Sequence, residues 1–244
     1  MQEHENWLAA LLNHALAGPA NAILDAVKLS HDAAHPWSGW MAMELLVAAI
    51  VVVVFAMLRS QLSMDSPGRM QHVFEAVYSF LKSQTEESVE HHGEKYLGFF
   101  GTLFIFILFM NLIGLIPGFE SPTMFPMVPA GCAVSVFLYY NWAGIREQGL
   151  GKYLAHFAGP MPAIAPLMIP IEIISHMARP LSLTIRLFAN MFAGEKVTFA
   201  FMALVPLAVP AVFMGLHVFV SFLQAYIFAL LAMIYVGIAV AHEH

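Results

Sequence analysis

The chain has 244 residues, of which 60% are hydrophobic and 11% are charged, and its mean hydropathy is +0.74. So much apolar surface excludes an ordinary water-soluble domain and indicates an all-α integral membrane protein, with residues 1–244 forming a single membrane domain. The net charge of −6 leaves no basic surface for nucleic acid, and the single cysteine, Cys132, excludes an internal disulfide. We assign Cys132 to packing.

The first 39 residues precede the first long apolar segment. They include a short apolar run with no Lys or Arg before it, unlike a secretory signal or a transit peptide. We expect residues 1–39 to be an uncleaved N-terminal segment on the outer side of the membrane.

Five apolar segments approach or exceed the roughly 20 residues that a membrane-spanning helix needs. The predicted membrane helices are residues 40–58, 97–116, 128–145, 163–203 and 211–240. Lys and Arg are concentrated in the loops after the first and third segments, whereas residues 117–130 contain none. The positive-inside rule therefore predicts an outer N-terminus and a cytoplasmic C-terminus.

Residues 66–90 predict an amphipathic helix between the first two spans. Ser66 can cap it, Pro67 suits its first position, and apolar residues then recur at helical spacing. This helix either lies on the cytoplasmic membrane surface or packs on neighbouring protein. His91 and His92 have no further ligands nearby, so we interpret residues 86–94 as a solvated loop and expect neither a metal nor a cofactor.

The fourth apolar segment is unusually long. Some 40 residues correspond to a helix of about 60 Å, twice the thickness of the hydrocarbon core, so such a helix must tilt steeply or break. Pro160, Pro162, Pro166 and Pro170 predict an irregular start. With a turn at residues 205–210, the last two segments predict an inclined hairpin that fits against another protein's curved wall.

Polar side chains follow one broad face of each of these last two helices. On residues 163–203 they are Glu172, Ser175, His176, Arg179, Ser182, Arg186 and Asn190, and on residues 211–240 they are His217, Ser221, Gln224 and Tyr235. We expect the first set to form a buried seam. The plainer alternative for Ser175, Ser182 and Ser221 is hydrogen bonding between helices, and Glu172 and Arg179 can reach the cytoplasmic interface.

Arg186 is the strongest indication of function. A guanidinium does not lose its proton, and a central arginine costs roughly 3 kcal/mol in a membrane helix. We therefore expect it to face protein, a partner or a water-filled cavity and to act on anions or protons. Glu195 follows nine residues later, about 13 Å along the axis and half a turn away, which excludes a direct ion pair within the helix.

The segments RPLSLTIRLFANMFAGE (179–195) and HVFVSFLQAYIF (217–228) closely resemble the subunit a family of F-type ATP synthases. FMNLIGLIPGF (109–119), PIEIISHM (170–177) and the closing AHEH extend the resemblance over most of the chain after residue 40. The resemblance implies five spans and a surface helix, with the last two spans forming a tilted hairpin against the rotating c-ring.

The resemblance also implies roles for individual residues. Arg186 would be the essential arginine that separates two half-channels and attracts the ring carboxylate. The implied residues of the ion path are Asn190, Glu195, His217 and Gln224, with Glu172, Ser175 and Asn111 on its cytoplasmic side. Relatives often have an Asn- or Asp-rich stretch before the third span, where this chain has residues 117–129 and Glu120 as a candidate substitute.

The implied function is that of the proton-translocating stator subunit of a rotary F-type ATP synthase in the bacterial inner (plasma) membrane. The implied partners are the c-ring, the subunit b peripheral stalk, the remaining ATP synthase subunits and the lipid bilayer. No P-loop motif is present, so ATP chemistry is assigned to other chains. We favour H⁺ over Na⁺ as the transported ion.

Three alternatives have weaker support. A haem-binding cytochrome would use His176 and His217 as axial ligands but does not explain Arg186. A secondary transporter should show two halves of similar hydropathy, and no such repeat is visible. A structural scaffold leaves the polar faces unexplained.

Overall fold

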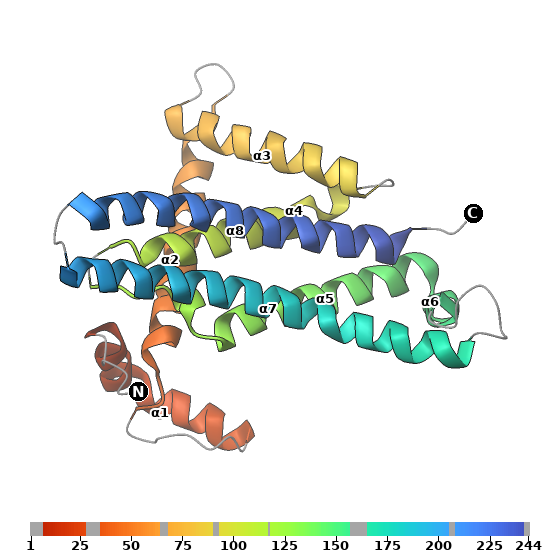
Figure 1. Ribbon diagram of the computed structural model, residues 1–244, viewed down its shortest axis with the longest axis horizontal. Coiled ribbons are helices and arrows are strands. Elements are labelled where there is room, and N and C mark those ends of the chain that lie inside the picture. The colour runs from red at the N-terminus through yellow and green to blue at the C-terminus, as the bar shows by residue number, and fades with distance from the viewer. Residues whose placement is uncertain are drawn as a thin grey trace.

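The computed structural model describes residues 7–27, 35–63, 68–89, 93–116, 118–156, 165–204 and 208–241 (Figure 1). All regular structure in these ranges is helical, which confirms the predicted all-α class. The helices are α1 (Trp7–Val27), α2 (Gly39–Gln61), α3 (Arg69–Ser88), α4 (Glu94–Ile113), the 3-10 turn η1 (Pro122–Met124), α5 (Met127–Gln148), α6 (Leu150–His156), α7 (Ala165–Leu204) and α8 (Ala208–Val240).

Each predicted helix has a counterpart whose ends lie within a few residues of the expected ones. Three helices of the described ranges are long and apolar enough to cross a membrane, namely α2, α4 and the Ala211–Val240 part of α8. α5 and α7 contain more polar and charged residues. The predicted cap at Ser66 and Pro67 and the histidine pair His91 and His92 lie outside the described residues.

Two helices, α1 and α6, were not predicted. α1 bends at Leu16, where φ is −127°, and contains Pro19. Asn13 fixes α1 to the start of α2, because its side-chain amide donates to the Trp37 carbonyl at 3.1 Å and accepts from the Trp37 amide at 2.9 Å. The Trp37 indole adds a bond to the Leu16 carbonyl at 3.2 Å. The segment before the first span therefore packs against it.

The expected irregular start of the long helix was wrong over the described residues. α7 is helical for 40 residues from Ala165 and contains Pro170 and Pro180. A proline removes one backbone hydrogen bond, but membrane helices tolerate this where neighbouring helices and side chains satisfy the freed group. Pro160 and Pro162 lie outside the described residues. In Figure 1, α7 and α8 run antiparallel side by side, and α2 crosses them steeply.

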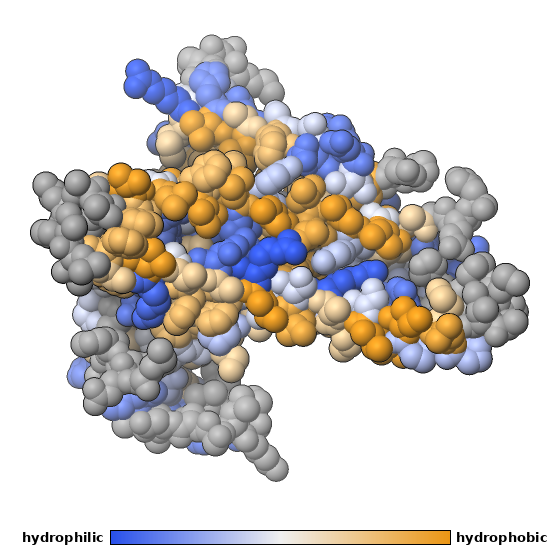
Figure 2. Space-filling view, viewed as in Figure 1, coloured by the Kyte–Doolittle hydropathy of each residue, from blue (hydrophilic) through white to orange (hydrophobic). Residues whose placement is uncertain are grey.

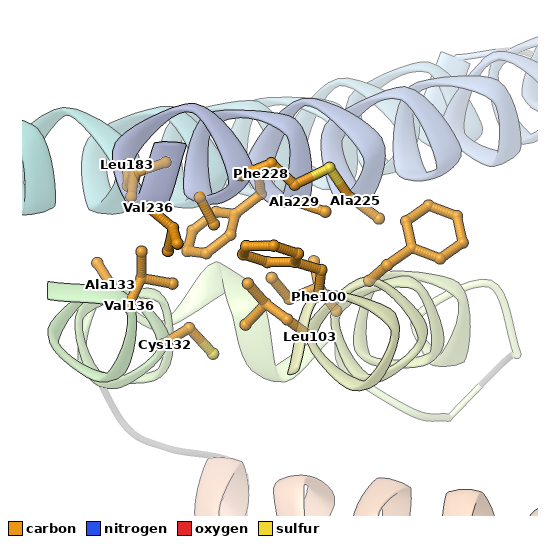
Figure 3. Close-up of a cluster of buried hydrophobic side chains, with 14 of the residues drawn as sticks. Phe100, Leu103, Cys132, Ala133, Val136, Leu183, Ala225, Phe228, Ala229 and Val236 are labelled. Carbon is orange, nitrogen blue, oxygen red and sulfur yellow. The ribbon is translucent and has the colours of Figure 1, made fainter. Parts of the chain in front are cut away.

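α8 supplies the centre of the core. Its residues Ala225, Phe228, Ala229, Ala232, Met233 and Val236 are fully buried. They pack with Phe100 and Leu103 of α4, Ala133 and Val136 of α5, and Leu183 of α7 (Figure 3). Small side chains let membrane helices approach closely, and dispersion contacts then hold them together. Cys132 is a free thiol buried in the same cluster, consistent with a packing role.

The cytoplasmic-side ends of α5 and α8, in the predicted orientation, are joined through Gly144 and Gln148. A Cβ at Gly144 would lie 2.6 Å from the Tyr153 ring and 2.9 Å from the Ala239 carbonyl oxygen. The Gln148 amide donates to the carbonyls of Ala239 at 3.0 Å and Ala241 at 2.8 Å. These bonds satisfy carbonyls that the end of α8 leaves without helical partners.

We predict that Gly144→Ala destabilises the bundle by about 1 to 3 kcal/mol, because the methyl group must displace a ring and a backbone carbonyl. Gly131→Ala is the matched control in the same helix, since a Cβ there meets no atom within 4 Å. The temperature at which the chain aggregates in solubilised membranes measures both effects. Equal midpoints for the two variants would contradict the close approach.

Candidate functional site

The polar face of α7 divides into a buried and an exposed part. His176 is buried, whereas Ser182, Arg186 and Asn190 are exposed, so the prediction of one buried seam was wrong for these three residues. The buried positions instead follow a narrower line of residues spaced four or seven apart. This line consists of His176, Leu183, Leu187, Met191 and Glu195.

Arg186 lies near the middle of α7, the 22nd of its 40 residues, and points away from the core. No hydrogen bond, ion pair or cation–π contact joins it to another described residue. Exposed apolar side chains such as Leu181 and Ile185 flank it. Figure 2 shows hydrophilic surface enclosed by hydrophobic surface along the α7–α8 face. The guanidinium is therefore available to a group outside this chain.

One turn beyond Arg186, a polar contact joins α7 to α8. The Asn190 amide donates to Gln224 Oε1 at 2.7 Å. Gln224 is only 2% exposed, and its Nε2 makes no hydrogen bond within the described residues. This pair fixes the register of the two helices next to the arginine.

A second polar group lies farther along α7. Glu195 is 6% exposed, and its Oε2, like His217 Nε2, is buried without a hydrogen-bond partner among the described residues. A Cβ at Gly194 would lie 3.4 Å from His217 Nδ1, so this glycine makes room for the imidazole. A hollow of about 290 Å³ between α7 and α8 is lined by Asn190, Gly194 and His217, among others.

Glu120 belongs to the surroundings of this outer group. It is exposed, it lies two residues before η1, and its carboxylate is close enough to Glu195 for an electrostatic interaction. Its suggested role as a substitute polar residue of residues 117–129 stays a prediction, and Pro117 itself lies outside the described residues.

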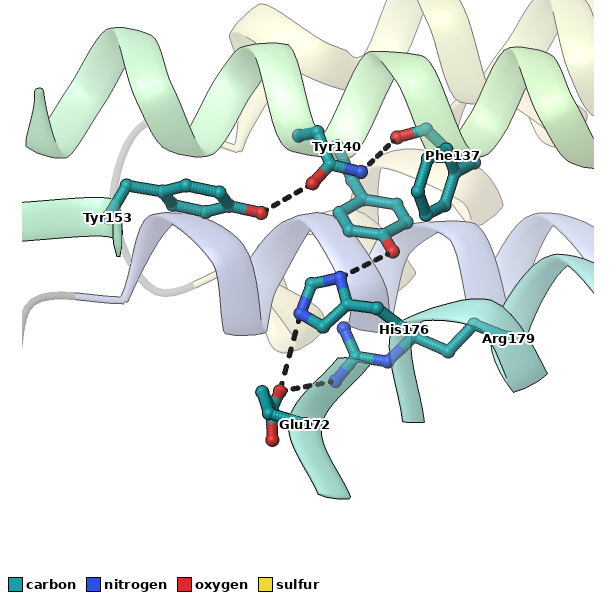
Figure 4. Close-up of polar contacts among 7 residues, drawn as sticks. Phe137, Tyr140, Tyr153, Glu172, His176 and Arg179 are labelled. Carbon is teal, nitrogen blue, oxygen red and sulfur yellow. Dashed lines mark hydrogen bonds and ion pairs between the residues drawn. The ribbon is translucent and has the colours of Figure 1, made fainter. Parts of the chain in front are cut away.

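A third polar group is formed where α7 meets α5 (Figure 4). His176 Nδ1 lies 3.0 Å from the Tyr140 hydroxyl, and His176 Nε2 lies 3.3 Å from Glu172 Oε1. An imidazole protonated at Nε2 suits both contacts. Arg179 lies 3.8 Å from the same carboxylate oxygen and stands over the rings of Tyr140 and Tyr235 at 5.7 and 5.4 Å. We call Tyr140, Glu172, His176, Arg179 and Tyr235 the inner group, and its polar side chains contact one another.

Ser175 is half-buried beside the inner group, and Asn111 is fully buried elsewhere. The Asn111 amide donates to the Ser221 carbonyl at 3.3 Å and accepts from the Thr123 hydroxyl at 2.7 Å. It sits two residues before the end of α4, next to η1. In the predicted orientation this end of α4 lies on the outer side of the membrane. The predicted orientation therefore conflicts with the prediction that Asn111 lies on the cytoplasmic path.

The haem alternative finds no support in this arrangement. His176 contacts Tyr140 and Glu172, whereas His217 faces Gly194, 18 residues farther along α7. That separation corresponds to about 27 Å of helix, too far for two ligands of one iron.

Three tyrosines in or near the inner group had no expected site role, namely Tyr140, Tyr153 and Tyr235. The Tyr153 hydroxyl donates to the Asn141 side chain at 2.7 Å. Only Tyr235 carried a signal, through its place on the polar face of its helix. Tyr140 and Tyr153 come from α5 and α6, and no single-helix pattern reveals how α5 packs against α7 and α6.

These features define a class: a helical membrane protein whose longest antiparallel helix pair carries an exposed arginine between two polar groups. The family profile for the ATP synthase A chain matches residues 41–237. ATP synthase subunit a of Solibacter usitatus is 65% identical over 234 residues, which is 96% of this chain and 100% of that protein. ATP synthase subunit a of Koribacter versatilis is 51% identical over 242 residues, 99% of each chain. The chain belongs to the ATP synthase A chain family.

We predict that Asn190 and Gln224 are energetically coupled. Interhelical hydrogen bonds in membranes contribute about 0.6 kcal/mol on average and at most about 1.7 kcal/mol. A double-mutant cycle of Asn190→Ala and Gln224→Ala, measured by denaturant-induced unfolding in detergent, should give a coupling in this range. Strictly additive effects would show that the contact contributes nothing to the pairing of α7 and α8.

Proposed function

We propose that this chain is the proton-translocating stator subunit a of a rotary F-type ATP synthase. The relatives that cover nearly the whole chain carry that name, and the family profile spans all of the polar positions discussed above. The observation that carries the proposal is Arg186, an exposed cation near the middle of α7 without a partner among the described residues. Such a cation fits an acidic partner that moves past it.

The two polar groups would belong to two half-channels, each reaching only to mid-membrane. The hollow beside His217 and Glu195 would admit protons from the outer side. Glu172, with Ser175 and His176 nearby, would lie on the path to the cytoplasmic side. An ion could then cross only while bound to a carboxylate of the c-ring. Gln224 and Asn190 would hold the two helices together beside that carboxylate.

Arg186 would act by electrostatics. Its positive charge favours the ionised form of the ring carboxylate, so the proton leaves on the exit side and the carboxylate reloads after rotation. The same charge repels hydronium and prevents direct leakage between the half-channels. Each proton is driven by about 2.3 kcal/mol per 100 mV of membrane potential, and this energy becomes torque.

The finer architecture belongs to the same proposal. α5, at 22 residues, and α7, at 40, are long enough to join α2, α4 and α8 as spans, which gives five crossings and one membrane domain. α3 would lie on the cytoplasmic surface. The N-terminus would be outside and the C-terminus inside a bacterial inner membrane. H⁺ would be the transported ion, and subunit b would be a neighbour in the stator.

We predict that Arg186→Ala abolishes ATP synthesis driven by a proton gradient in membrane vesicles. Arg186→Lys should fail as well, because an ammonium lacks the planar fork and loses its proton more readily in a low-dielectric site. Arg146→Gln is the control, since that guanidinium stands over Trp142 at the end of α5. Normal coupled synthesis by Arg186→Ala would refute the assignment.

We predict that Glu195→Gln combined with His217→Ala slows proton flux by roughly tenfold or more, because it removes the titratable group that lines the outer hollow and the neighbouring buried carboxyl group of Glu195. Thr198→Ala is the control. Thr198 lines the same hollow, and the substitution removes only a hydroxyl that already donates to the Gly194 carbonyl at 2.8 Å. Fluorescence quenching of a pH-sensitive dye in vesicles measures the flux. An unchanged rate in the double variant would exclude a relay through these residues.

A further inference from the structure

A groove of about 470 Å³ lies between α2, α3 and α4, away from the Arg186 site. Its lining is mostly apolar, with Phe55 and Leu62 on or next to α2 and Ile105 on α4. Its polar lining includes Gln71 and Glu75 of α3 and Glu94 at the start of α4. None of the proposed proton-path residues touches it.

The groove is confined to one leaflet of a membrane. Along α2 its lining runs from Leu62, just beyond the helix end, back to Phe55. These seven steps correspond to about 11 Å at 1.5 Å per residue, and any tilt of α2 makes the depth smaller. The hydrocarbon core is about 30 Å thick. Along α4 the lining runs from Glu94 to Ile105, about 16 Å. Because α3 lies across this end of α2 (Figure 1), the groove extends from the membrane surface under α3 to about the midplane.

The size of the groove argues against a neighbouring spanning helix as its occupant. A helix about 10 Å wide takes up roughly 420 Å³ per turn, so the groove holds about one turn, whereas a spanning helix has five or more. Two glycines of α4 help to form the groove. Gly98 and Gly101 line it, and a Cβ at Gly98 would meet no atom within 4 Å. The shape is that of a slot for an alkyl chain.

The charge at the mouth of the groove is negative. Gln71 donates to Glu75 at 2.8 Å and holds that carboxylate at the lining. Glu94 is paired with Lys82, and this hydrogen bond raises the pKa of Lys82, so the two charges neutralise each other. No Lys or Arg occurs among the described lining residues. His72 Nδ1 lies 3.7 Å from Glu75 Oε2 and is charged only when protonated. With His72 neutral, Glu75 leaves a net negative charge that favours an ammonium group.

We propose that this groove binds one phospholipid with an amine-bearing head group, such as phosphatidylethanolamine, from the leaflet on the α3 side. An acyl chain lies along Gly98 and Gly101, and the ammonium faces Glu75. In the predicted orientation this is the cytoplasmic leaflet. The site depends on the membrane placement of α2 and α4 but not on the rotary function.

The test uses the intact complex in liposomes that contain phosphatidylethanolamine with a photoactivatable group on its acyl chain. We expect labelled peptides from α2 and α4. Gly98→Leu should reduce this labelling about tenfold by filling the slot, whereas Gly131→Leu, at an exposed glycine of α5 with equal space, should not.

A second variant tests the head group and remains informative if Gly98→Leu does not assemble. The phosphatidylethanolamine probe should label the groove about three to five times more strongly than a phosphatidylglycerol probe, and Glu75→Gln should abolish that preference. Equal labelling by the two probes in the unmodified chain would overturn the proposal, as would unchanged labelling in Gly98→Leu. A photoactivatable side chain at position 98 that captures another subunit would also overturn it.

Discussion

A permanent positive charge near the middle of the long helix α7 is the constraint on which the arrangement of this protein depends. In hydrocarbon such a charge costs roughly 3 kcal/mol, and no described residue of the chain pairs with Arg186. The titratable groups His176 and Glu195 lie ten and nine residues away on either side, about 15 and 13 Å along the helix. At these separations neither group forms an ion pair with the arginine within the helix.

The rest of the fold holds that charge in place. The alanines of α8 allow α4, α5 and α7 to pack closely around α8. In lipid, dispersion replaces the hydrophobic effect as the main attraction between helices. Polar contacts add specificity to the packing of the hairpin, through Gln148 at the end of α8 and through the Asn190–Gln224 bond near the middle of the hairpin. The Tyr226 hydroxyl also donates to Gln84 of α3 at 2.7 Å, which ties the surface helix to the core.

Apolar length was sufficient to predict α2, α4, α5, α7 and α8, because a spanning helix must satisfy its own backbone. It failed for α1, where Pro19 and a bend interrupt a short run, and for the seven-residue α6. Helical periodicity placed the polar residues of α7 on one face, whereas the structure buries His176 and exposes Ser182, Arg186 and Asn190. Contacts between helices, such as Tyr140 with His176, depend on packing that one sequence does not encode locally.

The two polar groups beside Arg186 differ in a way that bears on how ions reach it. The outer hollow, at about 290 Å³, has room for roughly ten waters at 30 Å³ each, and its lining includes His217, whose Nε2 has no hydrogen-bond partner among the described residues. The space beside Glu172, His176 and Arg179 is only about 10 Å³, too small for more than one water. Among the described residues, this chain therefore leaves more room for water beside His217 than beside Glu172 and His176.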